Sequence, residues 1–295
     1  MSVINNRYEF VVFFDVENGN PNGDPDMGNM PRMDPETGNG LVTNVCLKRK
    51  IRNYVDAVKE GIPGYRIYVN KGTTLNANDA EAYAYLNVDP AGVKDAKKKD
   101  SQLDIKIRDF MCQNFFDIRA FGAVMTTFMA GALNCGQVRG PVQLTTARSV
   151  DPIVPQEVTI TRIAITTDAD AEKKTTEMGS KFIVPYGLYR VEGFISANLA
   201  KKTSGFSEED LELLWEAIMN MFEDDHSAAR GKMTVRKLVI FKHESVLGNA
   251  PAHKTLGLVH AKRREGVDVA RAYADYEVTI DIDSLPNGVS CEVKE

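Results

Sequence analysis

The sequence predicts a mixed α+β protein with one antiparallel sheet, a helical insertion and a projecting β-hairpin. Short apolar runs rich in Val, Phe and Ile predict strands, and two segments with apolar residues at helical spacing predict amphipathic helices. In chain order the elements are strand, helix, insertion, strand, hairpin, strand, helix and strand. This is the βαββαβ order of a ferredoxin-like or RRM-type sheet.

The first predicted strand is residues 7–16 (RYEFVVFFDV), an apolar run followed by Gly, Pro and Asn residues. Residues 17–40 are predicted to form a long ordered or semi-ordered loop, because several X-Pro bonds disfavour helix and the Gly and Asn residues tolerate turns. Loops longer than about 15 residues in compact domains are usually functional. Further strands are predicted at residues 138–144, 158–165, 182–195 and 234–243.

Two helices are predicted from their caps and their periodicity. The first begins at Thr43 or Asn44, either of which can act as its N-cap. The second covers residues 207–222, where Ser207 and Asp210 have the spacing of a capping box. One apolar stripe runs along each helix: Leu47, Ile51, Tyr54, Val55 and Val58 in the first, and Leu211, Leu214, Trp215, Ile218 and Phe222 in the second.

Two segments interrupt this regular pattern. Residues 61–100 lose periodicity and carry turn-forming dipeptides, so we predict an inserted subdomain with short helices. Residues 166–180 (TTDADAEKKTTEMGS) are polar and lie between two β-prone runs. That arrangement is typical of the tip of a projecting hairpin.

Composition and charge narrow the class of protein. Hydrophobic residues make up 43% of the 295 residues, which is sufficient for a sizeable core. We expect a cytoplasmic protein, because no apolar run has the length of a membrane span and the N-terminus lacks the layout of a signal peptide. The four cysteines are far apart, which predicts reduced thiols. The net charge of -5 argues against a surface that binds nucleic acid everywhere, but it is compatible with a local basic track.

The sequence carries none of the common signatures of catalysis or cofactor binding. A P-loop, a nucleophile elbow and a zinc-protease helix are absent, and a calcium-loop-like pattern that opens at Asn18 has Asn29 in place of Glu at its twelfth position. Asp224, Asp225 and His226 are adjacent at a helix end and cannot all face one ion, so we interpret them as a solvated turn. We therefore expect no enzyme activity, no cofactor and no metal.

The clearest binding signal is on the first predicted helix. Lys48, Arg49 and Arg52 share much of one face, and cations so placed can neutralise successive phosphates without reading sequence. A solvated helix face explains them about equally well, but the preceding loop offers backbone N–H groups that can also meet phosphates. Arg119 and Arg139 each lie beside a tight turn and are weaker candidates, which a structural salt bridge would also explain.

The predicted strands do not carry the aromatic signature with which RRM sheets stack RNA bases. The nearest run, RVEGFI at residues 190–195, has one aromatic residue, Phe194, which we expect in the core. RNA binding, if present, would therefore depend on the loops, the basic helix and the hairpin.

Residues 13–55 (FFDVENGNPNGDPDMGNMPRMDPETGNGLVTNVCLKRKIRNYV) closely resemble the backbone protein of subtype I-C CRISPR Cascade complexes. DIRAFGAVM (117–125), VRGPVQ (138–143) and TTDADAEKKTTEMGSKFIVPYGLYRVEGFISA (166–197) also resemble this family, so the resemblance covers nearly the whole chain. One departure is Asn44, where an acid would be expected, but both residue types cap helices well.

The resemblance implies three parts. An RRM-like palm would comprise residues 1–60, 117–148 and 183–295, helical fingers residues 61–116, and a β-hairpin thumb residues 149–182. It also implies a non-catalytic subunit that binds guide RNA (crRNA), polymerises along the spacer and presents the guide to target DNA. The implied partners are further copies of the chain and the crRNA 5′-handle, large and small subunits of Cascade, with no membrane.

Candidate RNA contacts combine the residue patterns with this resemblance. They lie on the long loop, the basic helix, the two tight turns and the hairpin. The expected RNA contacts are Asn18, Asn20, Asn22, Arg32, Thr43, Asn44, Lys48, Arg49, Arg52, Arg119, Arg139, Gln143 and Arg162, and the expected thumb contacts are Asp168, Lys173, Lys174 and Met178.

Two other functions remain open. The first is a metal-dependent ribonuclease, because related type III backbone subunits cut target RNA with an acidic loop residue. Asp24, Asp26, Asp151 and Asp168 lie on predicted loops, although each is also explained as a turn residue. The second is a generic RNA-binding module that does not polymerise, which leaves the projecting hairpin unexplained.

Overall fold

The computed structural model describes residues 2–89, 92–125, 135–172 and 175–295. Its central feature is a sheet in the spatial order β14-β11-β1-β10-β8-β4, with β7 and β9 also paired to β10. The strands are β1 (Tyr8–Gly19), β4 (Asn39–Val42), β7 (Val142–Leu144), β8 (Ala147–Pro152), β9 (Gln156–Arg162), β10 (Glu177–Ile195), β11 (Lys232–His243) and β14 (Val289–Lys294).

The predicted α+β class with antiparallel pairing is confirmed. Strand β1 lies between β10 and β11 and runs antiparallel to both, and β10 pairs antiparallel with β7 and β8 on its other side. Helices α1 (Asn44–Val58) and α8 (Glu208–Asn220) supply the two connections along the chain. The spatial order β11-β1-β10-β8 is that of a βαββαβ unit.

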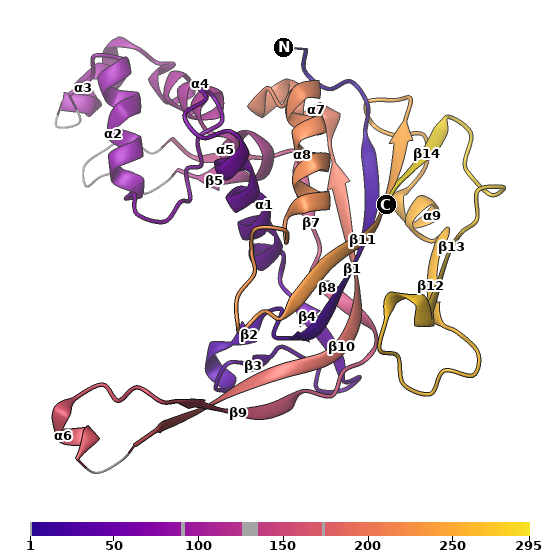
Figure 1. The fold of residues 1–295 in the computed structure, drawn as a ribbon. Coiled ribbons are helices and arrows are strands. Elements are labelled where there is room, and N and C mark those ends of the chain that lie inside the picture. The colour runs from indigo at the N-terminus through magenta and orange to yellow at the C-terminus, as the bar shows by residue number, and fades with distance from the viewer. Residues whose placement is uncertain (1, 90–91, 126–134, 173–174) are drawn as a thin grey trace.

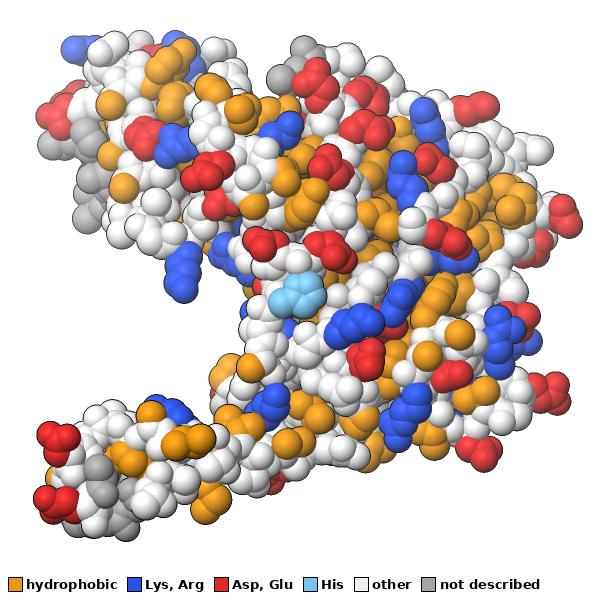
Figure 2. Space-filling view, in the orientation of Figure 1, with side chains coloured by type: hydrophobic (Ala, Val, Ile, Leu, Met, Phe, Trp, Pro, Cys, Tyr) orange, Lys and Arg blue, Asp and Glu red, His pale blue; other side chains and the backbone are white. Residues whose placement is uncertain are grey.

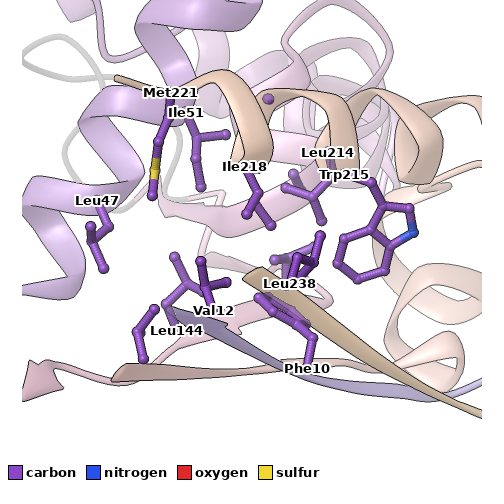
Figure 3. Packing of buried hydrophobic residues seen from close by; sticks show 14 of the residues in the cluster. Phe10, Val12, Leu47, Ile51, Leu144, Leu214, Trp215, Ile218, Met221 and Leu238 are labelled. Carbon is purple, nitrogen blue, oxygen red and sulfur yellow. The ribbon is translucent and has the colours of Figure 1, made fainter. Parts of the chain in front are cut away.

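One face of the sheet is covered by α1 and α8, as Figure 3 shows from close by. Phe10 and Val12 on β1 point toward the stripe of α8, where the Trp215 ring meets Phe10 edge-on at 5.1 Å between centroids. On α1, Leu47 and Ile51 are buried as predicted. The apolar stripe ends sooner than expected, because Val58 is 43% exposed.

Both helix caps form where the sequence predicts them. The Thr43 hydroxyl accepts a hydrogen bond from the Cys46 N–H at 3.2 Å, so α1 begins after Thr43. Ser207 and Asp210 form a reciprocal capping box at the start of α8. Such caps satisfy backbone donors that otherwise lack partners at a helix start.

The opposite face of the sheet is covered by the C-terminal segment, which contains α9 (Ala252–Leu256), β12 (Val259–Arg263) and β13 (Tyr276–Ile280). Buried Glu9 on β1 accepts from the Thr255 hydroxyl at 3.2 Å and pairs with His243 at 2.5 Å, which fastens this segment to the sheet. RRM proteins bind RNA on the corresponding face. That face is therefore closed in this chain, and Phe194 packs against its cluster.

The fingers have a hydrophobic core of their own. They contain α2 (Leu75–Tyr85), α3 (Val93–Lys99) and α4 (Leu103–Asn114), and their cluster also includes residues from α5 (Phe116–Phe121) and β6 (Gln137–Arg139). This core therefore extends past residue 116, where the palm was expected to resume. None of the helices in the described ranges is long and apolar enough to cross a membrane.

The single strand predicted over residues 138–144 is in fact two strands, β6 and β7, of which β6 pairs with β5 (Gly122–Val124). Gly140 lies at the break, and a Cβ there would come within 2.2 Å of the Phe121 carbonyl carbon. The chain turns at Gly140 because only glycine permits this approach.

The thumb is a two-stranded hairpin that extends away from the sheet (Figure 1). β9 pairs with residues 177–183 of β10, and the short helix α6 (Asp168–Ala171) lies in the tip. Ser149 and Ile153, which fall within the range 149–182 expected for the thumb, are buried. All β9 side chains are exposed or half-exposed, so the hairpin adds little to the core.

A buried ion pair joins the fingers to the palm. The Arg119 guanidinium on α5 donates to both carboxylate oxygens of Asp210 on α8, at 2.8 and 2.7 Å, and to the carbonyls of Cys112 and Gly64. Arg119 is 7% exposed and Asp210 is 1% exposed. The Arg119 guanidinium is thus used inside the protein, and its expected contact with RNA stays a prediction.

Replacing Arg119 with Ala is expected to lower the free energy of unfolding by about 3–5 kcal/mol, because it leaves the Asp210 carboxylate buried without its partner. Urea unfolding followed by circular dichroism measures this loss. Arg139→Ala is the matched control. The Arg139 side chain is exposed and makes no ion pair with the described residues, so its removal should change stability by less than about 0.5 kcal/mol. Equal stability of the two variants would contradict the assignment.

Candidate nucleic-acid interface

The fingers and the thumb border a wide concavity on the side of the molecule seen at the left of Figures 1 and 2. Lys and Arg side chains gather on its upper wall in Figure 2. The N-terminal end of α1, the loop after β1 and the loop before β11 enclose a groove of about 510 Å³. The groove is lined by Asn20, Pro21, Asn22, Gly23, Asn29, Thr43, Val45, Cys46, Arg49, Lys50, Ser227, Ala229 and Arg230.

The loop after β1 is more regular than the sequence predicts. β1 continues to Gly19, and residues 20–32 form a small hairpin of β2 (Gly23–Asp24) and β3 (Met30–Pro31) around a 3₁₀ turn. Asn22 Oδ1 accepts hydrogen bonds from both the N–H and the hydroxyl of Thr43, each at 2.9 Å. Asn20 donates to the Asn29 carbonyl at 2.7 Å. Both asparagines were expected to contact RNA. In the structure Asn22 holds the loop against the start of α1, and Asn20 joins the two sides of the loop.

Close backbone approach fixes the far side of the groove. A Cβ on Gly19 would lie 1.8 Å from the Arg230 carbonyl oxygen, and Gly231 has φ +61 and faces the Asn18 carbonyl. Glycine tolerates both constraints. The loop that carries Arg230 is therefore held directly against the end of β1.

Three cations of the groove differ in how they are paired. Arg49 makes no ion pair or hydrogen bond with the described residues, so its guanidinium remains available. Arg230 pairs with Asp225 at 2.9 Å and is 36% exposed. Lys50 is 2% exposed and also pairs with Asp225, although burial lowers the pKa of its ammonium group. Asp225 thus pairs with two of the three cations, and the lining of the groove carries a net positive charge.

The sequence reasoning missed Lys50, Asp225 and Arg230. One feature of the sequence could have indicated that Lys50 is paired. It lies three residues after Leu47 on the buried side of α1, and a buried cation needs a partner of opposite charge. Asp225, interpreted as part of a solvated turn, is only 16% exposed and provides that partner. No sequence pattern links two residues that are 175 positions apart.

A second basic cluster lies on the neighbouring side of α1. Lys48 Nζ donates to Gln143 Oε1 at 3.1 Å and lies 4.9 Å from the centroid of the Phe121 ring. Arg52 also lies over this ring and pairs with buried Asp117 at 2.8 Å. Arg52 is thus paired inside the protein, and its expected contact with an RNA phosphate stays a prediction. Lys48 has no carboxylate partner within the described ranges.

The other expected contacts are spread over the molecule. Asn18 and Arg139 are exposed, Asn44 donates to the Leu144 carbonyl at 3.4 Å, and Arg32 pairs with Asp24 at 3.1 Å. Arg162 lies on the thumb, where it pairs with Glu177 at 3.2 Å across the hairpin.

At the tip of the thumb, Asp168 begins α6 and Met178 is 74% exposed. Lys173 and Lys174 lie outside the described residues. These side chains do not line the groove at α1.

The acids considered for a ribonuclease are dispersed as well. Asp24 pairs with Arg32, and Asp151 accepts a hydrogen bond from the Tyr276 hydroxyl at 2.9 Å. Within the part of the chain that the structure describes, no group of three or more His, Cys, Asp and Glu side chains is arranged to hold a metal ion.

Comparison with known proteins shows the family. The model of the family "CRISPR-associated protein Cas7" matches residues 6–281, so the chain belongs to that family. It is similar to the CRISPR-associated protein Cas7 of Haloferax volcanii, with 27% identity over 232 residues that cover 73% of this chain and 65% of the relative. The chain thus spans slightly less than two thirds of that protein.

Solved structures with a similar chain include a CRISPR RNA-guided surveillance complex in a pre-nicking state (TM-score 0.47, 14% identity, 80% of this chain and 78% of the other). A second is described as a CRISPR RNA-guided surveillance complex (TM-score 0.43, 13% identity, 80% and 68%). A third is a type III-B Cmr-β complex bound to cognate target RNA (TM-score 0.43, 11% identity, 80% and 61%). TM-scores below 0.5 do not by themselves establish a common fold.

The environment of Lys48 predicts opposite effects of pH on folding and on binding. Burial and, next, the charge of Arg52 lower the pKa of Lys48 to about 8 from 10.5. Between these two pKa values Lys48 is protonated in the unfolded chain and largely neutral in the folded chain, so its contribution to the free energy of unfolding rises with pH. Below about pH 8 the lysine is charged in both states, and the charged form destabilises the folded chain. A bound phosphate favours the charged form, so RNA affinity should fall as pH rises through 8.

Lys48→Met is therefore expected to raise the melting temperature at pH 7 while it weakens RNA binding and flattens its pH dependence between pH 7 and 9. Thermal unfolding and filter binding measure the two effects. Lys98→Met is the control, because that side chain is 78% exposed and should leave both measurements unchanged. A lower melting temperature for Lys48→Met would show that the cation contributes to folding instead.

Proposed function

We propose that this chain is the non-catalytic, guide-RNA-binding backbone subunit of a subtype I-C CRISPR surveillance complex in the cytoplasm. In this proposal the RRM-like palm and the fingers hold the guide, the thumb reaches a neighbouring copy, and the filament presents the guide to target DNA. The subtype is supported by the resemblance of residues 13–55 described above. The partners would be further copies of the chain and the other Cascade subunits.

The observation that carries this proposal is the groove at the start of α1. Its lining combines the backbone of residues 20–23 with the uncommitted Arg49 and with Arg230 at the rim. Backbone N–H groups and guanidinium groups recognise phosphates without reading bases. The covered sheet face also favours recognition of phosphates, because the surface on which RRM proteins stack bases is covered here by the C-terminal segment. A scaffold that accepts any guide sequence requires such contacts.

Reversing the charge of Arg49 and Arg230 together tests the proposal. The Arg49→Glu/Arg230→Glu protein should remain folded and lose about tenfold or more of the RNA that co-purifies with the unaltered protein, because two phosphate contacts become repulsive. The RNA is measured by absorbance ratio and by its length on a denaturing gel.

Lys242→Glu/Lys254→Glu is the matched control, since it changes the net charge equally at two exposed lysines on β11 and α9, away from the groove. RNA content that is unchanged in the first variant, or lost equally in both, would refute the groove as the guide site. Cleavage of matched RNA by the unaltered protein with Mg²⁺ or Mn²⁺ would favour the ribonuclease instead.

The thumb is expected to act in assembly and not in folding. Deleting residues 168–180 and closing the gap with a short turn should leave the melting temperature nearly unchanged, because the strand before this tip is exposed and packs on no core. Filaments on guide RNA, observed by electron microscopy and sedimentation, should be weakened. Normal filaments, or an unfolded monomer, would contradict the thumb assignment.

A further inference from the structure

A second hollow lies at the opposite end of α1 from the guide groove. It has a volume of about 820 Å³, within the range of about 300–1,000 Å³ typical of small-molecule sites. Its walls come from the segment after α1, from α2 and α4 of the fingers, and from residues 201–205 of the palm. The 15 residues of α1 span about 22 Å, so the two sites are separate.

The fingers supply an aromatic wall. Tyr85 at the end of α2 is 66% exposed, and its ring lies 4.9 Å from the Phe110 ring of α4 between centroids. A large ring fixed by an aromatic neighbour and open to solvent is the arrangement on which nucleic-acid-binding proteins stack bases. Gln113 on the same wall is exposed, and amide side chains pair with base edges.

The palm supplies the cations of the hollow. Lys201 and Lys202 are exposed and make no ion pair or hydrogen bond within the described ranges. They belong to a π-helical turn, Ala200–Ser204, a conformation that is frequent at functional sites. Ser204 also lines the hollow, but its hydroxyl group is buried beneath the surface.

The charges that face the hollow favour an anion. The two lysines outnumber the one exposed carboxylate of the lining, Asp109. Arg119 also borders the hollow, but its guanidinium is neutralised by Asp210 and contributes structure. An aromatic surface beside two free ammonium groups matches a planar base that carries a phosphate.

We propose that this hollow binds a nucleotide unit, with the base against Tyr85 and the phosphate on Lys201 and Lys202. The inference does not depend on guide binding at α1. The same chemistry fits a free mononucleotide and a nucleotide of a single strand that passes between the fingers and the palm. If the natural ligand is part of a strand, an oligonucleotide should bind more tightly than a mononucleotide. If it is a free nucleotide, the two should bind equally.

The test uses the full chain with Arg49→Glu/Arg230→Glu in place, so that the guide groove does not contribute. Isothermal titration calorimetry with adenosine monophosphate and with a five-nucleotide single-stranded DNA should show binding of at least one probe. Tyr85→Ala should weaken it about tenfold or more, because each stacked base loses its aromatic partner. Tyr85→Phe, which keeps the ring, should stay within about twofold. Lys201→Glu/Lys202→Glu should weaken binding and reduce its dependence on salt.

Equal affinity for the two probes would identify a free nucleotide as the ligand, and tighter binding of the DNA would identify a strand. If neither probe binds, the proposal is overturned. Binding that Tyr85→Ala leaves unchanged would overturn it as well. All three altered side chains are exposed, so melting temperatures should match that of the background protein.

Discussion

The arrangement of the fingers on the palm depends on the buried pair between Arg119 and Asp210. A buried ion pair is stable only when its geometry is good and further hydrogen bonds satisfy its groups, and Arg119 donates to both carboxylate oxygens of Asp210 and to two backbone carbonyls. Asp210 also caps α8, so the same carboxylate fixes the start of a palm helix and the position of the insertion. The groove at the start of α1 and the hollow near Tyr85 are both lined by residues at the ends of α1 or in the segments that flank it.

Most of the fold could be predicted because its signals are local. Thr43 and Ser207 are short-range caps, and the spacing of Leu47 and Ile51 identifies a helix face without any knowledge of its partner. The regular pieces in residues 17–40 were missed, because β2 and β3 are two residues each and β1 continues past its apolar run to Gly19. Short strands are defined by pairing and not by composition.

The candidate site was harder to predict, because the role of a cation depends on whether a carboxylate lies near it. Arg49 and Arg52 are three positions apart on one helix, yet Arg52 is bound by Asp117 and Arg49 is not. The partners of Arg52 and Lys50 are 65 and 175 residues away in sequence. Periodicity can identify the face on which a charge lies, but the tertiary contacts decide which charges a ligand can still use.

Strand β10 connects the thumb to the sheet. Ile183 is the last residue to pair with β9, Val184 pairs with Gly19 of β1, and the next residue, Pro185, has no partner in either of these two ladders. At about 3.3 Å per residue the 19 residues of β10 form a rod of roughly 60 Å. The thumb therefore shares one continuous strand with the sheet, and the interruption at Pro185, which has no backbone N–H to donate, marks where the thumb begins.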